Sequence, residues 1–134
     1  MKSDGEKTYI FDVVRKKYLL LTNEEWVRQN FIHYLNKEKK YPLGLMGVEQ
    51  MVKYNSLKTR ADIVLYNTVG KAHIIVECKA TDVKITQDTF NQIAKYNSQL
   101  KVKYLLVTNG MNHYCCKMDY ERNRIAFLEE IPSY

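Results

Sequence analysis

The chain has 134 residues, 46% of them hydrophobic, which suffices for one domain with a single core but not for two ordinary domains. Its formal net charge of +6 favours polyanionic partners such as nucleic acid. The sequence has no 18-residue apolar segment and no apolar signal core near its N-terminus, which argues against export and membrane insertion. We therefore expect a cytoplasmic protein with no membrane partner.

The cysteines do not suit a secreted disulfide framework, because their number is odd and Cys115 and Cys116 are adjacent. Reduced thiols are expected. The spacing of His113, Cys115 and Cys116 leaves zinc as a minor alternative, although no second ligand pair stands at finger-like spacing. Cys78 is expected to be a small core residue.

The first 21 residues predict an N-terminal arm or a small hairpin. Two β-prone runs, 9–14 and 18–21, flank the basic Arg15-Lys16-Lys17, which we expect to be solvated. A core over residues 22–118 and a C-terminal edge and tail over 119–134 complete the expected single domain.

A helix over about residues 23–36 is predicted by its start signal and its periodicity. Thr22 and Glu25 have the spacing of a capping box, and apolar residues follow at helical intervals. Pro42 and Gly44 then break the chain before the next element.

Three consecutive strands are expected at residues 46–54, 59–67 and 71–79, as an antiparallel meander with a turn around residues 68–70. If the turn is tight and centred between Val69 and Gly70, Asp62 lies directly opposite Glu77. A slip of one residue would separate the two carboxylates, so the register is a testable prediction.

Side chains two residues apart on a strand point to the same face of the sheet. In this register Asp62, Glu77 and Lys79 therefore share one face. The other face is apolar and is expected to pack against a helix; it would consist of Ile63, Leu65, Ile74, Val76 and Cys78.

The second half of the core begins with a helix capped by Thr86, whose polar stripe contains Gln92 and Tyr96. Strands are expected at residues 103–108 and 112–118, around the turn Asn109-Gly110, with an edge strand at 124–128. Because a helix connects strands 71–79 and 103–108, these two should be parallel, in a mixed sheet covered by helices. The expected class is α/β.

Two carboxylates and a lysine at the end of two apolar strands suit a divalent metal that acts on a phosphodiester. Mg²⁺ prefers oxygen ligands and needs only one or two carboxylates from the protein. We predict Asp62 and Glu77 as metal ligands, the backbone carbonyl of Cys78 as a third, and Lys79 as the group that holds or deprotonates the attacking water. A solvent-facing ion pair between Glu77 and Lys79 is the alternative, which the apolar surroundings disfavour.

Five short motifs, in order along residues 9–118, resemble the PD-(D/E)xK nuclease superfamily, and specifically the N-terminal nuclease domain of type I restriction enzyme motor subunits. They are Thr22-Asn23-Glu24-Glu25-Trp26-Val27-Arg28-Gln29, Thr59-Arg60-Ala61-Asp62-Ile63-Val64, Val76-Glu77-Cys78-Lys79-Ala80, Gln92-Ile93-Ala94-Lys95-Tyr96 and Thr108-Asn109-Gly110. One departure is Ala61, which stands where the superfamily has a nominal proline. The resemblance implies a restriction-endonuclease-like core, with a mixed central β-sheet flanked by helices.

The resemblance also implies roles for individual residues. Asp62 and Glu77 would be metal ligands and Lys79 the catalytic lysine, in agreement with the chemistry above. Glu25, or its neighbour Glu24, would correspond to the first-helix acid that approaches the metal site. A purely capping role for Glu25 is an equal alternative.

Gln92 and Tyr96 match the glutamine and tyrosine that follow the catalytic lysine in RecB-like nucleases, where they support the active site and contact DNA. A solvated helix face is the alternative for both residues.

Together these observations predict a Mg²⁺-dependent deoxyribonuclease that acts as an endonuclease in restriction-modification. Mn²⁺ is expected to substitute for Mg²⁺. No helicase motor is expected in this chain. A homodimer or a larger nuclease/helicase complex would supply double-strand cleavage. The rival hypothesis is a non-catalytic nucleic-acid-binding or protein-interaction module that retains the nuclease fold.

Overall fold

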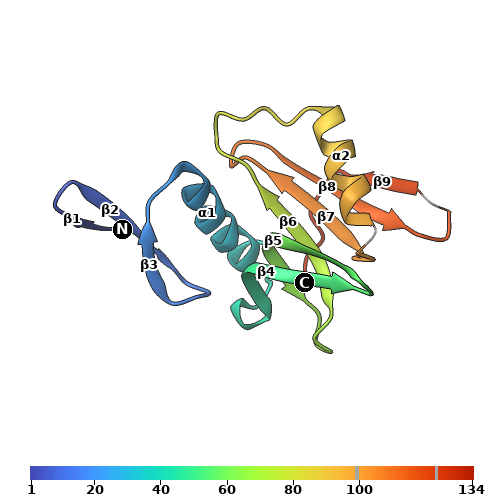
Figure 1. Cartoon of the computed structure of the whole chain (residues 1–134), viewed down its shortest axis with the longest axis horizontal. Coiled ribbons are helices and arrows are strands. Elements are labelled where there is room, and N and C mark those ends of the chain that lie inside the picture. Colours follow the sequence, from blue (N-terminus) through green and yellow to red (C-terminus); the bar gives the residue numbers. More distant parts are fainter. Residues whose placement is uncertain (99, 123) are drawn as a thin grey trace.

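The computed structural model describes residues 1–98, 100–122 and 124–134, without the side chains of Tyr54, Leu57, Thr59, Lys95, Tyr96 and Ser98 (Figure 1). A six-stranded sheet in the order β4-β5-β6-β7-β8-β9 forms the body, and a three-stranded sheet, β1-β2-β3, precedes it. The elements are β1 (Lys2–Asp4), β2 (Lys7–Asp12), β3 (Lys17–Leu20), α1 (Asn23–Lys37), a 3₁₀ turn η1 (Leu43–Leu45), β4 (Met46–Tyr54), β5 (Leu57–Tyr66), β6 (Ala72–Cys78), α2 (Gln87–Ser98), β7 (Tyr104–Thr108), β8 (His113–Asp119) and β9 (Arg124–Leu128).

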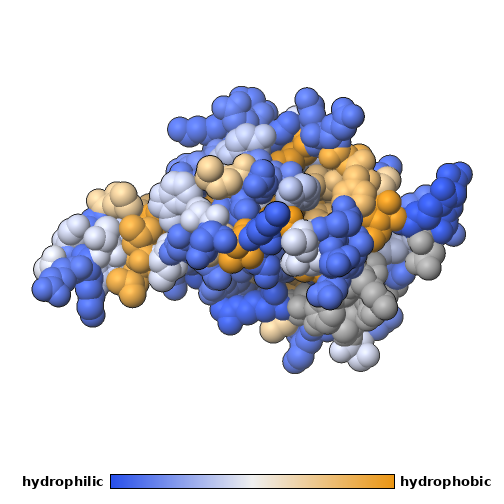
Figure 2. Space-filling model, turned by 90° about the horizontal axis from the view of Figure 1, so that it is seen from above, coloured by the Kyte–Doolittle hydropathy of each residue, from blue (hydrophilic) through white to orange (hydrophobic). Residues whose placement is uncertain are grey.

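The N-terminal segment forms more structure than the predicted arm or hairpin. Strands β2 and β3 make the hairpin, and β1 adds a third antiparallel strand through pairing of Lys2 with Tyr9. Figure 1 shows this sheet on one side of α1 and the six-stranded sheet on the other. Hydrophobic side chains are exposed on it, among them Phe11 and Leu20. In Figure 2 some orange surface lies near that end of the molecule, among blue and white atoms.

Helix α1 begins where its capping signal predicts. The Thr22 hydroxyl accepts a hydrogen bond from the Glu25 backbone N–H at 3.1 Å, so one unpaired donor of the first turn is satisfied. The helix continues to Lys37, one residue beyond the predicted end. Its apolar side chains pack against one face of the large sheet, where Val27, Phe31 and Leu35 meet the strands.

The strand register agrees with the prediction. Ile63 pairs with Val76 and Leu65 with Ile74, which places the hairpin centre between Val69 and Gly70; an irregularity follows at Tyr66. All five residues predicted for the apolar face lie in the core that contains α1: Ile63, Leu65, Ile74, Val76 and Cys78. Strands β6 and β7 are parallel, as the helical crossover requires.

Helix α2 covers the opposite face of the sheet. The hydroxyl of Thr86 accepts from the Thr89 backbone N–H at 3.2 Å, which confirms the predicted cap. Phe90 and Ala94 then pack with Val64 and Ile75 in a second core. The sheet is thus buried on both faces, with helices on each, as expected for the α/β class (Figure 1). No helix among the described residues is long and apolar enough to span a bilayer.

Candidate active site

Asp62 and Glu77 meet at one end of the β5–β6 pair. They are the next residues beyond the last recorded pair, Ile63 with Val76, and their side chains are close enough to share a hydrogen bond. The backbone N–H of Cys78 donates to Asp62 Oδ2 at 2.8 Å, which fixes the carboxylate against β6. Lys79 follows directly, and its backbone N–H donates to the Thr108 carbonyl at 2.8 Å. The structure therefore brings all three predicted residues to the same edge.

The electrostatics of Glu77 reflect this crowding of carboxylates. Its pKa is raised to about 7, mainly by burial and then by the charge of Asp62; Lys79 lowers it, and a hydrogen bond between the Glu77 and Asp62 side chains raises it. The two neighbouring carboxylates repel each other when both are ionised. A bound cation would reduce this repulsion and favour the ionised form of both.

Glu25, rather than Glu24, faces this site. Glu24 is exposed, whereas Glu25 is only 9% exposed. Its carboxylate accepts hydrogen bonds from Arg28 Nη1 at 2.8 Å, from Gln29 Nε2 at 3.1 Å and from Arg15 Nη2 at 3.4 Å. The side chain thus belongs to a buried polar cluster, while its backbone N–H serves the helix cap.

Arg28 is the main site residue that the sequence interpretation missed. It is 5% exposed, and its guanidinium lies 2.8 Å from Glu25, 3.2 Å from Asp62 and 3.5 Å from Glu49. Burial alone would lower the pKa of Arg28, but Glu25, Asp62 and Glu49 raise it. A usable signal was present: Arg28 stands three residues after Glu25 on the side of α1 that carries Val27 and Phe31.

Arg15 corrects the expectation that the basic run 15–17 is solvated. Lys16 and Lys17 are exposed, but Arg15 pairs with Asp12, Glu25 and Glu49. Glu49 also pairs with Arg60 at 2.8 Å. Burial would raise the pKa of Glu49, but these arginines lower it. The sequence around a basic residue in a short turn does not indicate that it will pair with acids far along the chain.

The two residues predicted on the second helix, Gln92 and Tyr96, are not linked to this cluster by any recorded contact of the described residues. Gln92 lies on α2 and is exposed. The side chain of Tyr96 lies outside the described residues. Roles for Gln92 and Tyr96 in supporting the site or contacting DNA therefore remain predictions.

Loops hold the segment after Lys79 in place. Asn23 and Thr81 form two hydrogen bonds, from Asn23 Nδ2 to Thr81 Oγ1 at 2.9 Å and from the Thr81 N–H to Asn23 Oδ1 at 2.7 Å. Asn109 donates to the Val83 carbonyl at 2.8 Å. The Asn109-Gly110 turn therefore joins α1 in supporting the chain beside Lys79.

The donor set fits a hydrated Mg²⁺ or Mn²⁺. Two converging carboxylates supply hard oxygen ligands, and such ions keep several waters. Gln29 Oε1 is buried beside Glu25 and accepts no hydrogen bond from the described part of the chain, so it is available to a water. Within that part there is no group of three or more His, Cys, Asp or Glu side chains placed to hold a metal ion.

The zinc alternative at His113 is not supported. Cys115 belongs to the core under α1 and Cys116 to the core under α2, so the thiols point to opposite faces of the sheet. His113 instead shares a hydrogen bond with the Thr108 hydroxyl at 2.6 Å and stacks against Tyr34. Cys78 is a buried core residue, as predicted.

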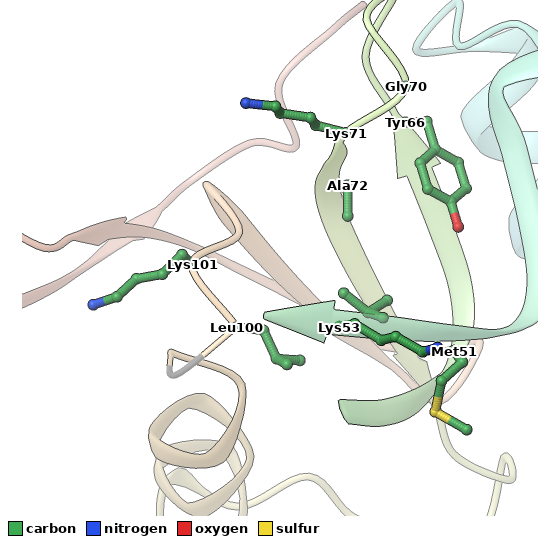
Figure 3. Close-up of a pocket in the computed structure, with 9 residues that line it drawn as sticks. Met51, Lys53, Tyr66, Gly70, Lys71, Ala72, Leu100 and Lys101 are labelled. Carbon is green, nitrogen blue, oxygen red and sulfur yellow. The ribbon is translucent and has the colours of Figure 1, made fainter. Parts of the chain in front are cut away.

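A hollow of about 500 Å³ lies elsewhere on the molecule, at the turn end of β6. Its lining includes Met51, Tyr66 and Leu100, with Lys71 and Lys101 directed away from it in Figure 3. None of the predicted site residues lines this hollow. The acidic cluster at the other end of β6 is therefore the better candidate for chemistry.

Comparison with known proteins identifies the family and the fold of the chain. Residues 23–132 match the family model described as type I restriction enzyme R protein N terminus (HSDR_N). The fragment structure of a putative HsdR subunit of a type I restriction enzyme from Vibrio vulnificus YJ016 is similar, with a TM-score of 0.56, 21% identity and coverage of 84% of this chain. The chain spans 24% of that fragment. The likeness shows a restriction-endonuclease-like fold. No curated protein matches.

Proposed function

Because the chain belongs to the family of type I restriction enzyme R protein N-termini, we propose that it is a metal-dependent nuclease domain that hydrolyses DNA phosphodiester bonds. One observation carries the proposal: Asp62 and Glu77 converge from adjacent strands with Lys79 beside them, and burial with mutual repulsion raises the pKa of Glu77 to about 7. Perturbed acids with a neighbouring lysine are typical of catalytic sites.

The proposed roles follow from the contacts. Asp62 and Glu77 would hold Mg²⁺ or Mn²⁺, together with the Cys78 carbonyl. When bound, the ion would stabilise negative charge on the phosphate and acidify a water ligand. Lys79 holds or deprotonates the attacking water. Glu25 and Gln29 position this edge of the site through their hydrogen bond of 3.1 Å. Exposed Gln92, together with Tyr96, would contact DNA.

The family also indicates the setting. R proteins of type I restriction enzymes work in assemblies that act on DNA, and we propose the same for this domain, as an endonuclease within a larger nuclease/helicase complex or as a homodimer. The net charge of +6 supports binding to a polyanion.

Plasmid nicking tests the proposal. With Mg²⁺ or Mn²⁺ the unchanged protein should convert supercoiled plasmid to open circle, and EDTA should stop the reaction. Asp62→Ala and Lys79→Ala should each slow nicking by about 100-fold or more, because they remove a metal ligand and the lysine at the water. Asp82→Ala and Lys84→Ala are matched controls, since both side chains are exposed on the following segment.

Equal nicking by the unchanged protein, Asp62→Ala and Lys79→Ala would disprove the catalytic assignment. DNA binding without any cleavage would instead support the non-catalytic module. Circular dichroism of each variant checks that the fold persists.

A further inference from the structure

We infer that the Arg28 guanidinium occupies the position of a second cation in the active site and so limits the site to one divalent ion. The inference rests on the proposed metal-dependent function. Enzymes that act on phosphodiesters frequently use two ions about 3.5–4 Å apart, each held by carboxylates. In this chain a fixed side-chain cation stands among the carboxylates instead.

The first argument is the coordination of Arg28. Its Nη1 lies 2.8 Å from Glu25 Oε1, and its Nη2 lies 3.2 Å from Asp62 Oδ1 and 3.5 Å from Glu49 Oε1. These acids come from three separate elements, α1, β5 and β4. Arg28 therefore supplies the positive charge that these three carboxylates share.

The second argument is that this positive charge is permanent and desolvated. An arginine stays protonated in proteins, unlike a lysine, and its planar fork spans two carboxylates at once. The Arg28 side chain is only 7% exposed, so water screens it little. A divalent ion at the same point would meet strong repulsion from it.

The third argument is that Glu25 and Glu49 are already satisfied. Both Glu25 oxygens accept hydrogen bonds, Oε1 from Arg28 and Oε2 from Gln29. Glu49 Oε2 accepts from Arg60 and from Arg15. Asp62 pairs with one arginine, Arg28 at Oδ1, whereas Glu25 pairs with two arginines and Glu49 with three. Its Oδ2 accepts only a neutral backbone N–H, that of Cys78, and its side chain lies beside Glu77, so the pair Asp62 and Glu77 is left for a single ion.

Counting bound ions tests the inference without DNA or turnover. Mn²⁺ is titrated into the protein, and the free ion is measured by electron paramagnetic resonance. The unchanged protein should bind one Mn²⁺ per chain. Arg28→Met keeps the length of the side chain but removes its charge, so it should bind two. Arg28→Lys keeps the charge and should bind one.

Arg60→Met is the matched control. Arg60 also pairs with Glu49, at 2.8 Å, but its side chain is 65% exposed and it contacts the cluster from outside. This variant should still bind one ion. A second ion in Arg60→Met would show that freeing Glu49 is sufficient, and would overturn the role of Arg28.

The remaining outcomes are decisive as well. Two ions on the unchanged protein, or one ion on folded Arg28→Met, would overturn the inference. If Arg28→Met does not fold, the count on the unchanged protein decides alone: one supports the inference and two overturns it. No bound ion would overturn both the inference and the proposed metal site. A correct count without plasmid nicking would leave the inference standing and remove only the proposed catalysis.

Discussion

The residues of the candidate site differ from the other charged residues of the chain in that several of them are buried. Glu77 carries a raised pKa and faces Asp62, while Arg28 and Glu25 are buried as a hydrogen-bonded pair. Burying such groups costs free energy unless they are paired, and natural sequences retain that cost mainly where function requires it. Stability and activity should therefore oppose each other at Glu77.

Replacing Glu77 tests that opposition. Its pKa is about 7 in the folded protein and 4.5 in the reference state, so the folded state binds more protons between these values. The free energy of unfolding should fall as pH rises from 4.5 to 7 and then level off. Glu77→Gln lacks this loss and should be about 1–3 kcal/mol more stable than the unchanged protein near pH ~8, but not near pH ~4.

Urea unfolding in EDTA at the two pH values measures this difference. Glu24→Gln is the control, because Glu24 is exposed one residue from the buried Glu25. An equal stability difference at both pH values would contradict the assigned strain at Glu77. Added Mg²⁺ should stabilise the unchanged protein more than Glu77→Gln.

The two kinds of site residue differ in how far the sequence could predict them. Asp62, Glu77 and Lys79 lie within one hairpin, so a short turn and strand alternation sufficed to place them together. Arg28 meets Asp62 and Glu49 only because α1 packs over the strands, and Glu49 has an unusual φ of 52°. Such contacts depend on helix orientation and on a local irregularity that periodicity does not encode.

At the scale of elements, the turn at Gly110 packs closely against α1. Gly110 has a φ of 88°, and a Cβ there would lie 3.3 Å from Val27 and 3.5 Å from Trp26. Gly70 has a similar φ of 82° but no neighbouring atom within 4 Å. Comparing Ala substitutions at the two glycines therefore separates the cost of backbone strain from the cost of steric contact with α1.

We expect both Gly→Ala substitutions to cost stability and Gly110→Ala to cost more. The left-handed backbone alone should cost about 1–2 kcal/mol in each variant. Gly110→Ala also pushes on α1 beside the Lys79 segment, so it should lose nicking activity that Gly70→Ala retains. Equal loss of stability in urea unfolding would show that the contact with α1 adjusts freely.

The β2–β3 turn makes a second connection between elements, through Arg15. Asp12 Oδ1 accepts the backbone N–H groups of Val14 and Arg15 at 2.9 and 3.0 Å, which shapes the turn. Burial would raise the pKa of Asp12, but hydrogen bonds from Arg15 and Val14 lower it. The Arg15 side chain then reaches Glu25 on α1 and Glu49 on β4.

Arg15→Ala should lower the free energy of unfolding by about 1–2 kcal/mol, because charged hydrogen bonds to buried acids are lost. Lys17→Ala is the control, since Lys17 is exposed in the same turn region. Thermal unfolding measures both. A loss no greater in Arg15→Ala than in Lys17→Ala would mean that the N-terminal sheet is energetically separate from the site.

At the scale of the whole molecule, each chain carries one candidate site among its described residues. A monomer should therefore cut one strand per encounter, and open-circle plasmid should precede the linear form. Gel densitometry over time measures both products. Linear DNA as the first product, with a rate that rises with the square of protein concentration, would show that two chains cut together, as in the proposed homodimer.

The overall fold was largely predictable, because long apolar strands around a helical crossover allow few topologies. The exception is β1. Lys2, Ser3 and Asp4 are all exposed, so no alternation marks a strand, and only pairing with β2 creates it. Hydrophobic patterns predict elements that contribute to a core and miss those held by backbone hydrogen bonds alone.

The two neighbouring cysteines of β8 offer built-in reporters of motion. Cys115 and Cys116 are separated by one peptide bond but lie in different core layers, and burial raises their pKa to about 12 and about 11. A thiol reagent can modify either one only when its own layer opens. Labelling rates at the two sulfurs would therefore show which of the two helix-covered core layers opens more often.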